Sequence, residues 1–345
     1  MSIFDNVDYK FPEDHMVINT IDMHTGGEPL RVIVSGFPEV KGSTILEKRR
    51  YVKDHLDYLR TSLMLEPRGH SDMYGCILTP PNTLDSDFGI IFLHNEGYST
   101  MCGHATIAIT KLAVEMGWVE KVMPLTTIKI DAPCGTITAY AQIKDSSVVS
   151  VSFDNVPSFV YQKNQELDLE GFGIVKYDIA YGGAFYVFVD ADEMGIPLKP
   201  SSYKKLIDVG MDIKRSVTKK SAISHPFDQD LSFLYGTIFT GKPLGNSDTR
   251  NVCIFADGEV DRSPTGSGVS ARMAIYHERG DLKVGDSMSF ESILGSTFVG
   301  SIKEKVNYGG FESIIPNVSG TAYVTGQHIF YIDPDDPMKD GFILK

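Results

Sequence analysis

The sequence lacks the features that mark several large classes of protein. It has no apolar stretch long enough to cross a membrane and no basic run with interleaved aromatic residues. Its 345 residues include 32 Lys and Arg against 45 Asp and Glu, which gives a formal net charge of −13. A chain this acidic is a poor candidate for binding nucleic acid or an anionic membrane. We therefore expect neither among its partners.

Signals for export and for cysteine-based frameworks are also missing. Residues 1–15 are polar and acidic, without the apolar segment of a signal peptide. The cysteines are widely separated and form no C-x-x-C pair, which argues against a zinc site and a disulfide framework. The set comprises Cys76, Cys102, Cys134 and Cys253. We expect a cytoplasmic protein with free thiols.

Metal-ligand spacing is absent as well. Three side chains that could suggest a metal, His24, His70 and Asp72, match no common ligand pattern. We expect no bound metal.

The length suits two domains, because one compact core rarely grows to this size. Composition is typical of a soluble globular protein, with 42% hydrophobic and 22% charged residues. Apolar spacing and glycine stops predict helices over 43–65, 103–116, 201–217 and 266–279, with 218–230 as a surface loop. Strands are predicted at 17–22, 30–34, 73–78, 88–93, 127–130, 136–142, 148–153, 174–180, 184–189, 231–239, 251–255, 287–292, 297–306, 320–324 and 328–332.

Each half of the chain is thus mostly strands plus one central helix entered through a tight turn. The two turns, residues 101–108 (MCGHATIA) and 264–271 (PTGSGVSA), align so that Cys102 falls on Thr265, 163 residues later. This weak internal repeat predicts two similar α/β halves that face each other across a cleft. We assign 1–160 plus 325–345 to the half that carries Cys102, and 161–324 to the half that carries Thr265.

These turns are suited to binding an anion. A helix N-terminus has backbone N–H groups without intrahelical partners and carries a partial positive charge. Two such helix starts would hold a small carboxylate between them. The expected donors are the amides of Gly103, His104, Gly266 and Ser267.

The same field would act on Cys102. A helix N-terminus can lower the pKa of a thiol into the neutral range, so that Cys102 could serve as a base or nucleophile. The commoner fate of a free cysteine is that of a small buried hydrophobe, but the paired turns favour the functional interpretation. Cys134 is also followed by a glycine, in Cys-Gly-Thr, yet its surroundings alternate like a hairpin. Cys76 and Cys253 lie in apolar strands and are interpreted as core.

Two charged residues precede the second turn. Asp261 could pair with a ligand amine, or it could cap the turn through the backbone. The residues leave these alternatives open. Arg262 is interpreted as a solvated or ion-paired surface residue.

Along most of its length the chain resembles the proline racemase family. The matching blocks are IDMHTGGEPLRVI (21–33), LEKRRY (46–51), LMLEPRGHSDMYG (63–75), GYSTMCGHATIA (97–108), NVPSF (155–159), DIAYGGAFY (178–186), VCIFADGEVDRSPTGSGVSARMA (252–274) and YIDPDDPMKDGF (331–342). The resemblance implies a diaminopimelate-epimerase-like fold of two pseudo-symmetric halves, with the substrate between two helix starts. It also implies an enzyme that uses neither metal nor pyridoxal phosphate, and suggests a homodimer.

The resemblance also assigns roles to site residues. Cys102 matches the first of two catalytic cysteines, Gly103, His104, Gly266 and Ser267 match the carboxylate-binding amides, and Asp261 matches a substrate-binding acid. Racemases have a second cysteine where this chain has Thr265. A hydroxyl is too weak an acid to replace that thiol unless a base stands beside it, and none is evident in the turn.

A single base suffices to remove an α-proton from a substrate that then expels a leaving group. Members of the family with this Cys/Thr pair are similar to trans-3-hydroxy-L-proline dehydratases, so we expect that activity on a small amino-acid substrate, with Thr265 orienting the substrate or the departing hydroxyl. The alternatives are a proline racemase or 4-hydroxyproline 2-epimerase that tolerates Thr265, and a non-catalytic protein that binds proline derivatives.

Overall fold

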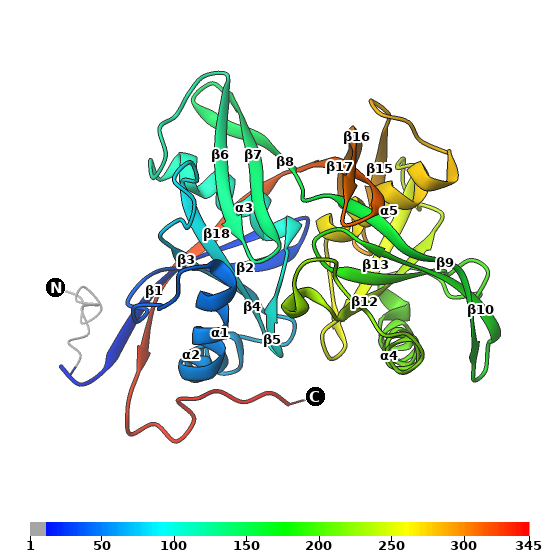
Figure 1. The fold of residues 1–345 in the computed structure, drawn as a ribbon. Coiled ribbons are helices and arrows are strands. Elements are labelled where there is room, and N and C mark those ends of the chain that lie inside the picture. Colours follow the sequence, from blue (N-terminus) through cyan, green and yellow to red (C-terminus); the bar gives the residue numbers. More distant parts are fainter. Residues whose placement is uncertain (1–11, 345) are drawn as a thin grey trace.

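The computed structural model describes residues 12–344, which form a strand-rich α/β protein (Figure 1). The segment expected to lack a targeting signal falls largely outside these residues. In Figure 1 the blue-to-cyan elements and the green-to-yellow elements form two groups that lie side by side. The C-terminal strand returns from the second group to the first, so the chain crosses between them more than once.

The first group of strands wraps around helix α3 (Gly103–Glu115). Its strands pair in the order β18, β1, β2, β3, β4, β6, β7 and β8, and the short β5 adds to β4. Their bounds are β1 Met16–Thr25, β2 Glu28–Ser35, β3 Tyr74–Thr79, β4 Phe88–His94, β5 Gly97–Ser99, β6 Leu125–Ala132, β7 Gly135–Lys144, β8 Ser147–Asp154 and β18 Ala322–Ile332.

The second group wraps around helix α5 (Gly266–Arg279). Its strands pair in the order β9, β10, β11, β12, β13, β15, β16 and β17, with the short β14 on β13. Strand β17 also pairs with β9, which closes a ring, and with β8 of the first group. The bounds are β9 Ser158–Leu169, β10 Gly173–Tyr181, β11 Phe185–Asp190, β12 Leu234–Gly241, β13 Thr249–Phe255, β14 Glu259–Val260, β15 Ser287–Glu291, β16 Thr297–Tyr308 and β17 Phe311–Gly320.

Both groups use the same sequence of parallel and antiparallel pairs. The parallel pairs are β2 with β3 and β4 with β6 in the first group, and β11 with β12 and β13 with β15 in the second. Parallel neighbours need a crossover segment, and helices supply it between β2 and β3 and between β11 and β12. The α/β fold class is confirmed; the division at residues 160 and 325 and the pseudo-symmetry of shape stay predictions.

Helices differ from expectation mainly in the first half. The predicted single helix over 43–65 is wrong, because it is two helices, α1 (Ile45–His55) and α2 (Asp57–Met64), separated at Leu56. The backbone of Leu56 leaves the helical region, and this break lets both helices bury their apolar faces against β4. Helix α4 (Tyr203–Lys220) runs three residues into the predicted loop. The bounds of α5 agree with the prediction.

Besides the short β5 and β14, two long strands escaped prediction for physical reasons. Strand β9 is rich in polar residues, and β17 contains Pro316, which has no N–H to give to a sheet. The sheet accommodates Pro316 beside a register shift in β16, and its carbonyl accepts from the amide of Asn155. The predicted strands 320–324 and 328–332 are one continuous strand, β18.

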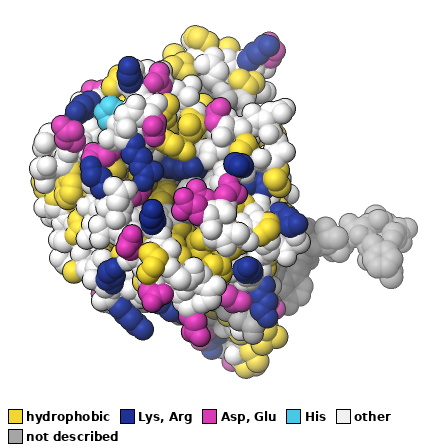
Figure 2. Space-filling view, turned by 90° about the vertical axis from the view of Figure 1, so that its right-hand side faces the viewer, with side chains coloured by type: hydrophobic (Ala, Val, Ile, Leu, Met, Phe, Trp, Pro, Cys, Tyr) yellow, Lys and Arg dark blue, Asp and Glu magenta, His cyan; other side chains and the backbone are white. Residues whose placement is uncertain are grey.

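The surface carries charges of both signs. On the face in Figure 2, Lys and Arg side chains are interspersed with Asp and Glu, without a large area of one sign. Across residues 12–344, the helices are all too short or too polar to cross a bilayer.

Candidate active site

The N-termini of α3 and α5 meet face to face. A Cβ built on Gly103 would lie 2.6 Å from the Cα of Gly266, and one built on Gly266 would lie 2.8 Å from the Cα of Gly103. Only glycine permits so close an approach of two backbones. The positive ends of two helices are thus brought together, an arrangement that an anion between them would stabilise.

All seven residues predicted for the site line one cavity between these helix starts. They are Cys102, Gly103, His104, Asp261, Thr265, Gly266 and Ser267. The cavity measures about 20 Å³, room for roughly one water molecule. A substrate therefore requires the surrounding side chains or the two halves to move apart.

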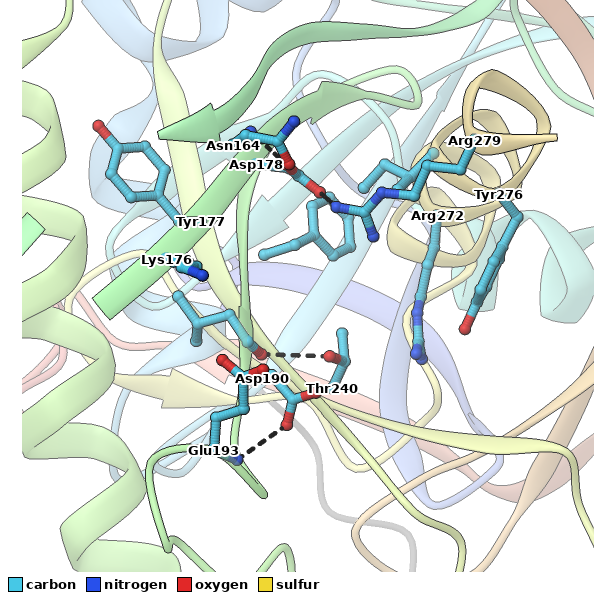
Figure 3. Close-up of a pocket in the computed structure, with 13 residues that line it drawn as sticks. Asn164, Lys176, Tyr177, Asp178, Asp190, Glu193, Thr240, Arg272, Tyr276 and Arg279 are labelled. Atoms are coloured by element: carbon cyan, nitrogen blue, oxygen red, sulfur yellow. Dashed lines mark hydrogen bonds and ion pairs between the residues drawn. The ribbon is translucent and has the colours of Figure 1, made fainter. Parts of the chain in front are cut away.

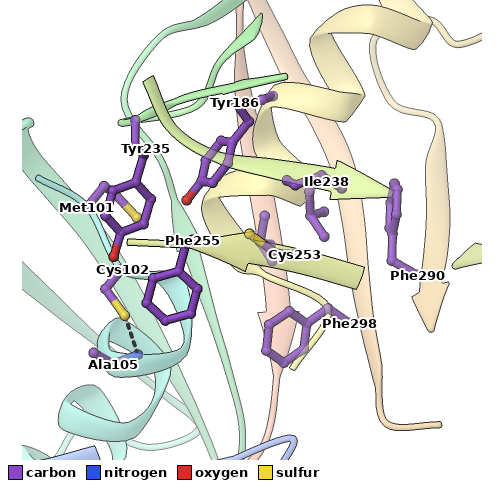
Figure 4. Packing of buried hydrophobic residues seen from close by; sticks show 14 of the residues in the cluster. Met101, Cys102, Ala105, Tyr186, Tyr235, Ile238, Cys253, Phe255, Phe290 and Phe298 are labelled. Atoms are coloured by element: carbon purple, nitrogen blue, oxygen red, sulfur yellow. Dashed lines mark hydrogen bonds between the residues drawn. The ribbon is translucent and has the colours of Figure 1, made fainter. Parts of the chain in front are cut away.

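Cys102 is the N-cap residue of α3. Its backbone is extended, and its Sγ accepts a hydrogen bond from the amide of Ala105 at 3.4 Å (Figure 4). Burial raises the pKa of the Cys102 thiol well above its ordinary value, while the Ala105 amide and Tyr74 lower it and Asp261 raises it further. The expected lowering of this pKa by the helix start is therefore wrong for this closed conformation, because removal from water outweighs the helix field.

His104 lies against the same thiol. Its Nδ1 is 3.1 Å from Cys102 Sγ. Burial lowers the pKa of His104 to about 3, and the backbone of Pro29 opposes this shift. The ring is therefore neutral near pH 7, and a neutral ring has one nitrogen that can accept a proton.

Thr265 starts α5 with a strained backbone. Its φ of 65° lies in the left-handed region, where a β-branched residue is rare, and its hydroxyl does not cap the helix. Instead Thr265 Oγ1 donates to Asp261 Oδ2 at 2.8 Å, and the Thr265 amide donates to Ser263 Oγ at 3.1 Å. Strain of this kind costs about 1–3 kcal/mol and is concentrated at functional sites.

Asp261 settles one question that the sequence left open. Its Oδ1 accepts from the amide of Ser263 at 2.7 Å, so it does cap the turn, and its Oδ2 remains for Thr265. Burial raises the pKa of Asp261. The expectation that no base stands beside Thr265 is therefore wrong: the base is four residues away in sequence, and the folded turn brings it into contact.

Several lining residues were not predicted. Tyr186 hydrogen-bonds with the hydroxyl of Ser267 at 2.7 Å. Cys253 was interpreted as core and is buried, but it also lines the cavity. The other unpredicted lining residues are Tyr74, Met101, Tyr235 and Phe255. The family resemblance was the sequence signal that could have found some of them, because its matching blocks include Tyr74, Tyr186, Cys253 and Phe255.

Tyr235 connects this cavity to a larger one. It also lines a cavity of about 500 Å³ that is bordered by both halves and includes Arg49 and Lys214. In Figure 4 the Tyr235 ring lies close to the Cys102 side chain. The Tyr235 side chain thus stands between the cavity around Cys102 and the larger one.

Arg262 and Cys134 were interpreted as peripheral, and the structure agrees in part. Arg262 is half-buried rather than solvated: its Nη1 pairs with Asp72 at 2.5 Å, and its amide donates to Glu28. This contact links the two halves. Cys134 lies at the β6–β7 hairpin as predicted and does not line the site cavity. The described residues contain no cluster of three His, Cys, Asp or Glu side chains suited to a metal.

The fold and this site place the protein in a class of strand-rich α/β proteins in which the N-termini of two helices meet at one cavity. The structure superimposes on the crystal structure of a hydroxyproline epimerase from Agrobacterium vitis with bound trans-4-hydroxy-L-proline. The TM-score is 0.90 at 30% identity, covering 95% of this chain and 96% of that one.

Sequence comparison gives the family. The proline racemase family model matches residues 20–343, and the chain belongs to that family. It is 50% identical over 334 residues to a trans-3-hydroxy-L-proline dehydratase from Colwellia psychrerythraea, covering 96% of this chain and 94% of that protein. It is 44% identical over 329 residues to a 3-hydroxyproline 2-epimerase from Burkholderia multivorans, covering 95% and 98%.

Proposed function

We propose that this protein is a trans-3-hydroxy-L-proline dehydratase that forms Δ1-pyrroline-2-carboxylate and water. The observation that carries the proposal is the asymmetric pair across the cavity, a thiol at Cys102 and a hydroxyl at Thr265. Relatives of that name that are 43–50% identical over most of the chain support the same activity.

The substrate carboxylate binds between the two helix starts. The amides of Gly103, His104, Gly266 and Ser267 lie in the first turns, where they have no intrahelical acceptors. Because Gly103 and Gly266 are in contact, both sets of donors address one small anion. The same amides stabilise the negative charge that develops when the α-proton leaves.

Cys102 takes the α-proton. Its raised pKa means that the thiol is protonated in the closed site, so substrate binding has to favour the thiolate. The cationic nitrogen of the bound amino acid and the two helix starts do so electrostatically. His104 Nδ1 lies 3.1 Å from Sγ, but burial lowers the pKa of His104 to about 3, so the neutral ring hydrogen-bonds with the sulfur and does not hold its proton. The thiol proton passes to water while the site is open, and His104 positions Cys102 in addition to providing an amide donor.

Thr265 and Asp261 serve the departing hydroxyl. Thr265 Oγ1 is hydrogen-bonded to Asp261 Oδ2, and burial raises the pKa of this carboxyl, so the pair can exchange a proton with the departing hydroxyl. Thr265 in turn donates to the 3-hydroxyl, which leaves as water while the C2–H bonding pair forms a double bond between C2 and C3. Protonation of this enamine at C3 and loss of a proton from the ring nitrogen then move the double bond to C2=N, which gives Δ1-pyrroline-2-carboxylate. A carboxylate does not turn an alcohol into a base as strong as a thiolate, so this pair supplies a proton better than it removes one.

The direct test is turnover of a panel of proline and 3- and 4-hydroxyproline isomers in deuterium oxide, read for pyrroline product and optical rotation. We expect pyrroline from trans-3-hydroxy-L-proline and little inversion of any isomer. Absence of pyrroline from a folded wild-type protein would overturn the proposal.

An epimerase is the second candidate, and the contact between Asp261 and Thr265 favours it over the non-catalytic alternative. Deuterium uptake with inversion would support it, whereas uptake without inversion would fit a site with one base. Thr265→Cys tests what separates a dehydratase from an epimerase. With a thiol on each side of the cavity, we expect inversion of the substrate α-carbon to rise above the wild-type level. Stabilisation by pyrrole-2-carboxylate without turnover of any isomer would instead indicate a binding protein.

The remaining proposals concern the setting of the enzyme. We propose a cytoplasmic homodimer without metal or organic cofactor. The four cysteines are free and buried, which suits a reducing compartment. Light scattering of the purified chain and activity after exhaustive chelation test the dimer and the metal-independence.

A further inference from the structure

A cavity of about 310 Å³, here called the second cavity, lies beside helix α5 (Figure 3). Residues of α5, β10, β11 and the turn after β11 line it, and none of them lines the cavity around Cys102. The two cavities lie along one helix: Gly266 and Ser267 start α5 at the first, and Arg272, Tyr276 and Arg279 line the second.

Arg272 is the unusual residue of this second cavity. Four arginines are buried in residues 12–344, and three of them have an ion pair: Arg31 with Asp22, Arg60 with Asp57 and Arg250 with Glu291. Arg272 is 8% exposed and forms no direct ion pair among the described residues; Asp190 acts on it only at longer range, and its Nη1 donates to the Arg250 carbonyl and to Asn251. A buried guanidinium with only this partial compensation would be stabilised further by an anion in the cavity.

Two other charged side chains of the lining have partners of their own. Arg279 is paired with Asp178 at 2.5 Å, and Asp190 Oδ1 accepts from the amides of Asp192 and Glu193. Figure 3 shows the Arg272 side chain extending from α5 toward the side of the cavity where Asp190 and Thr240 lie. Asp190, Glu193 and Lys176 form the exposed rim. A dianion such as phosphate would face two carboxylates there, whereas a ligand with separated opposite charges matches both sides.

We propose that this cavity binds a small amino acid in its zwitterionic form, with the carboxylate on Arg272 and the ammonium group toward Asp190 and Glu193. The cavity volume is ample for such a ligand. The site is distinct from the substrate site, and its occupancy does not depend on the proposed dehydratase activity.

A chain of hydrogen bonds connects this site to the catalytic turn. Arg272 Nη1 donates to Asn251 Oδ1 at 2.7 Å, and Asn251 Nδ2 donates to the carbonyl of Pro264 at 3.1 Å. Pro264 immediately precedes the strained Thr265. A carboxylate that draws the Arg272 guanidinium into the cavity therefore acts on the turn that holds Thr265, and we propose that the amino acid changes ligand affinity at the active site. This coupling rests on the proposed function, since it assumes that Thr265 faces the substrate.

The binding experiment keeps the two sites apart. L-Alanine is titrated calorimetrically into the full chain in the presence of saturating pyrrole-2-carboxylate, which occupies the active site. We expect one further molecule of L-alanine per chain, and weaker binding of acetate, methylamine and inorganic phosphate. No saturable binding, or phosphate binding more tightly than L-alanine, would overturn the proposal whether or not the protein is a dehydratase.

Variants locate the site. Arg272→Met should weaken L-alanine binding roughly tenfold or more, because a charged hydrogen-bonding partner is lost. Glu193→Gln lies on the exposed rim, leaves the fold intact and should weaken it severalfold. The control Arg215→Gln removes an exposed arginine that lines neither cavity, and should change nothing. Unchanged binding in both Arg272→Met and Glu193→Gln contradicts the assignment.

The coupling has its own readout. L-Alanine should shift the dissociation constant of pyrrole-2-carboxylate in the wild type, and Asn251→Ala should abolish that shift while L-alanine still binds. A shift that survives in Asn251→Ala, or no shift in the wild type, would remove the coupling and leave only the binding site.

Discussion

Cys102 and Thr265 occupy equivalent positions at the starts of α3 and α5, but their backbones and side chains are arranged differently. At α3, Cys102 has an ordinary extended backbone, and its side chain caps the helix by accepting from Ala105. At α5, Thr265 has a positive φ, and its hydroxyl is turned away from the helix toward Asp261. The comparison teaches that equivalent positions in a repeated motif can take different chemical roles. The Cys102 side chain lies against a neutral histidine, and the Thr265 side chain lies against a carboxyl group.

Removing the thiol should give the largest effect. Cys102→Ser replaces the base with a hydroxyl that is hardly ionised, so turnover should fall by about 10³-fold, while circular dichroism and the unfolding midpoint stay close to wild type. Cys134→Ser is the matched control, because Cys134 also precedes a glycine and lies outside the cavity. Full pyrroline production by Cys102→Ser would mean that another group takes the proton.

Changing the other side of the pair should have a smaller effect. Thr265→Val keeps the branched shape and removes the hydroxyl, so the relay to the leaving group is cut while Cys102 remains. We expect turnover to fall by about 10²-fold, with α-proton exchange into solvent retained. If exchange and dehydration disappear together, Thr265 supports the first step and the division of labour is wrong.

The contact between the helix starts can be broken directly. Gly266→Ala places a methyl group against the Gly103 backbone, and neither backbone can give way alone. Unfolding free energy should fall by about 1–3 kcal/mol, as for other overpacked sites, and affinity for pyrrole-2-carboxylate should fall with it. Because Gly103→Ala disturbs the same contact, the double variant should cost less than the two single variants together. Additive costs in denaturant titrations would show that the two glycines act independently.

The smallest expected effect concerns pH. Burial holds the pKa of His104 at about 3, below its ordinary value of 6.5, so between these values the unfolded chain binds more protons than the folded one. Stability should therefore rise with pH across this window and be lost as the pH falls from 6.5 toward 3. His225, whose pKa burial lowers to about 4, acts in the same direction. His104→Asn should flatten the dependence in denaturant titrations, and an unchanged slope would contradict a buried neutral His104.

Much of the fold could be predicted because its signals are local. Helix α5 has the bounds expected from a glycine-rich start and Gly280, and the alternation around Cys134 correctly indicated a hairpin. Strand β17 could not be predicted in this way. Its sequence contains a proline, and its place in the sheet comes from pairing not only with the neighbouring β16 but also with β8 and β9, which lie far away in the chain.

For the candidate site, the sequence by itself determined which residues begin the two helices, since a cap position and the following glycines are read over a few residues. Only the tertiary structure decided what those residues touch. The approach of Gly103 to Gly266 joins positions 163 residues apart, and burial, which no short motif reports, raises the pKa of Cys102. The contact of Asp261 with Thr265 depends on both the local sequence and the tertiary structure. Both residues stand in one short turn, but their contact goes with the positive φ of Thr265, which a short motif does not report.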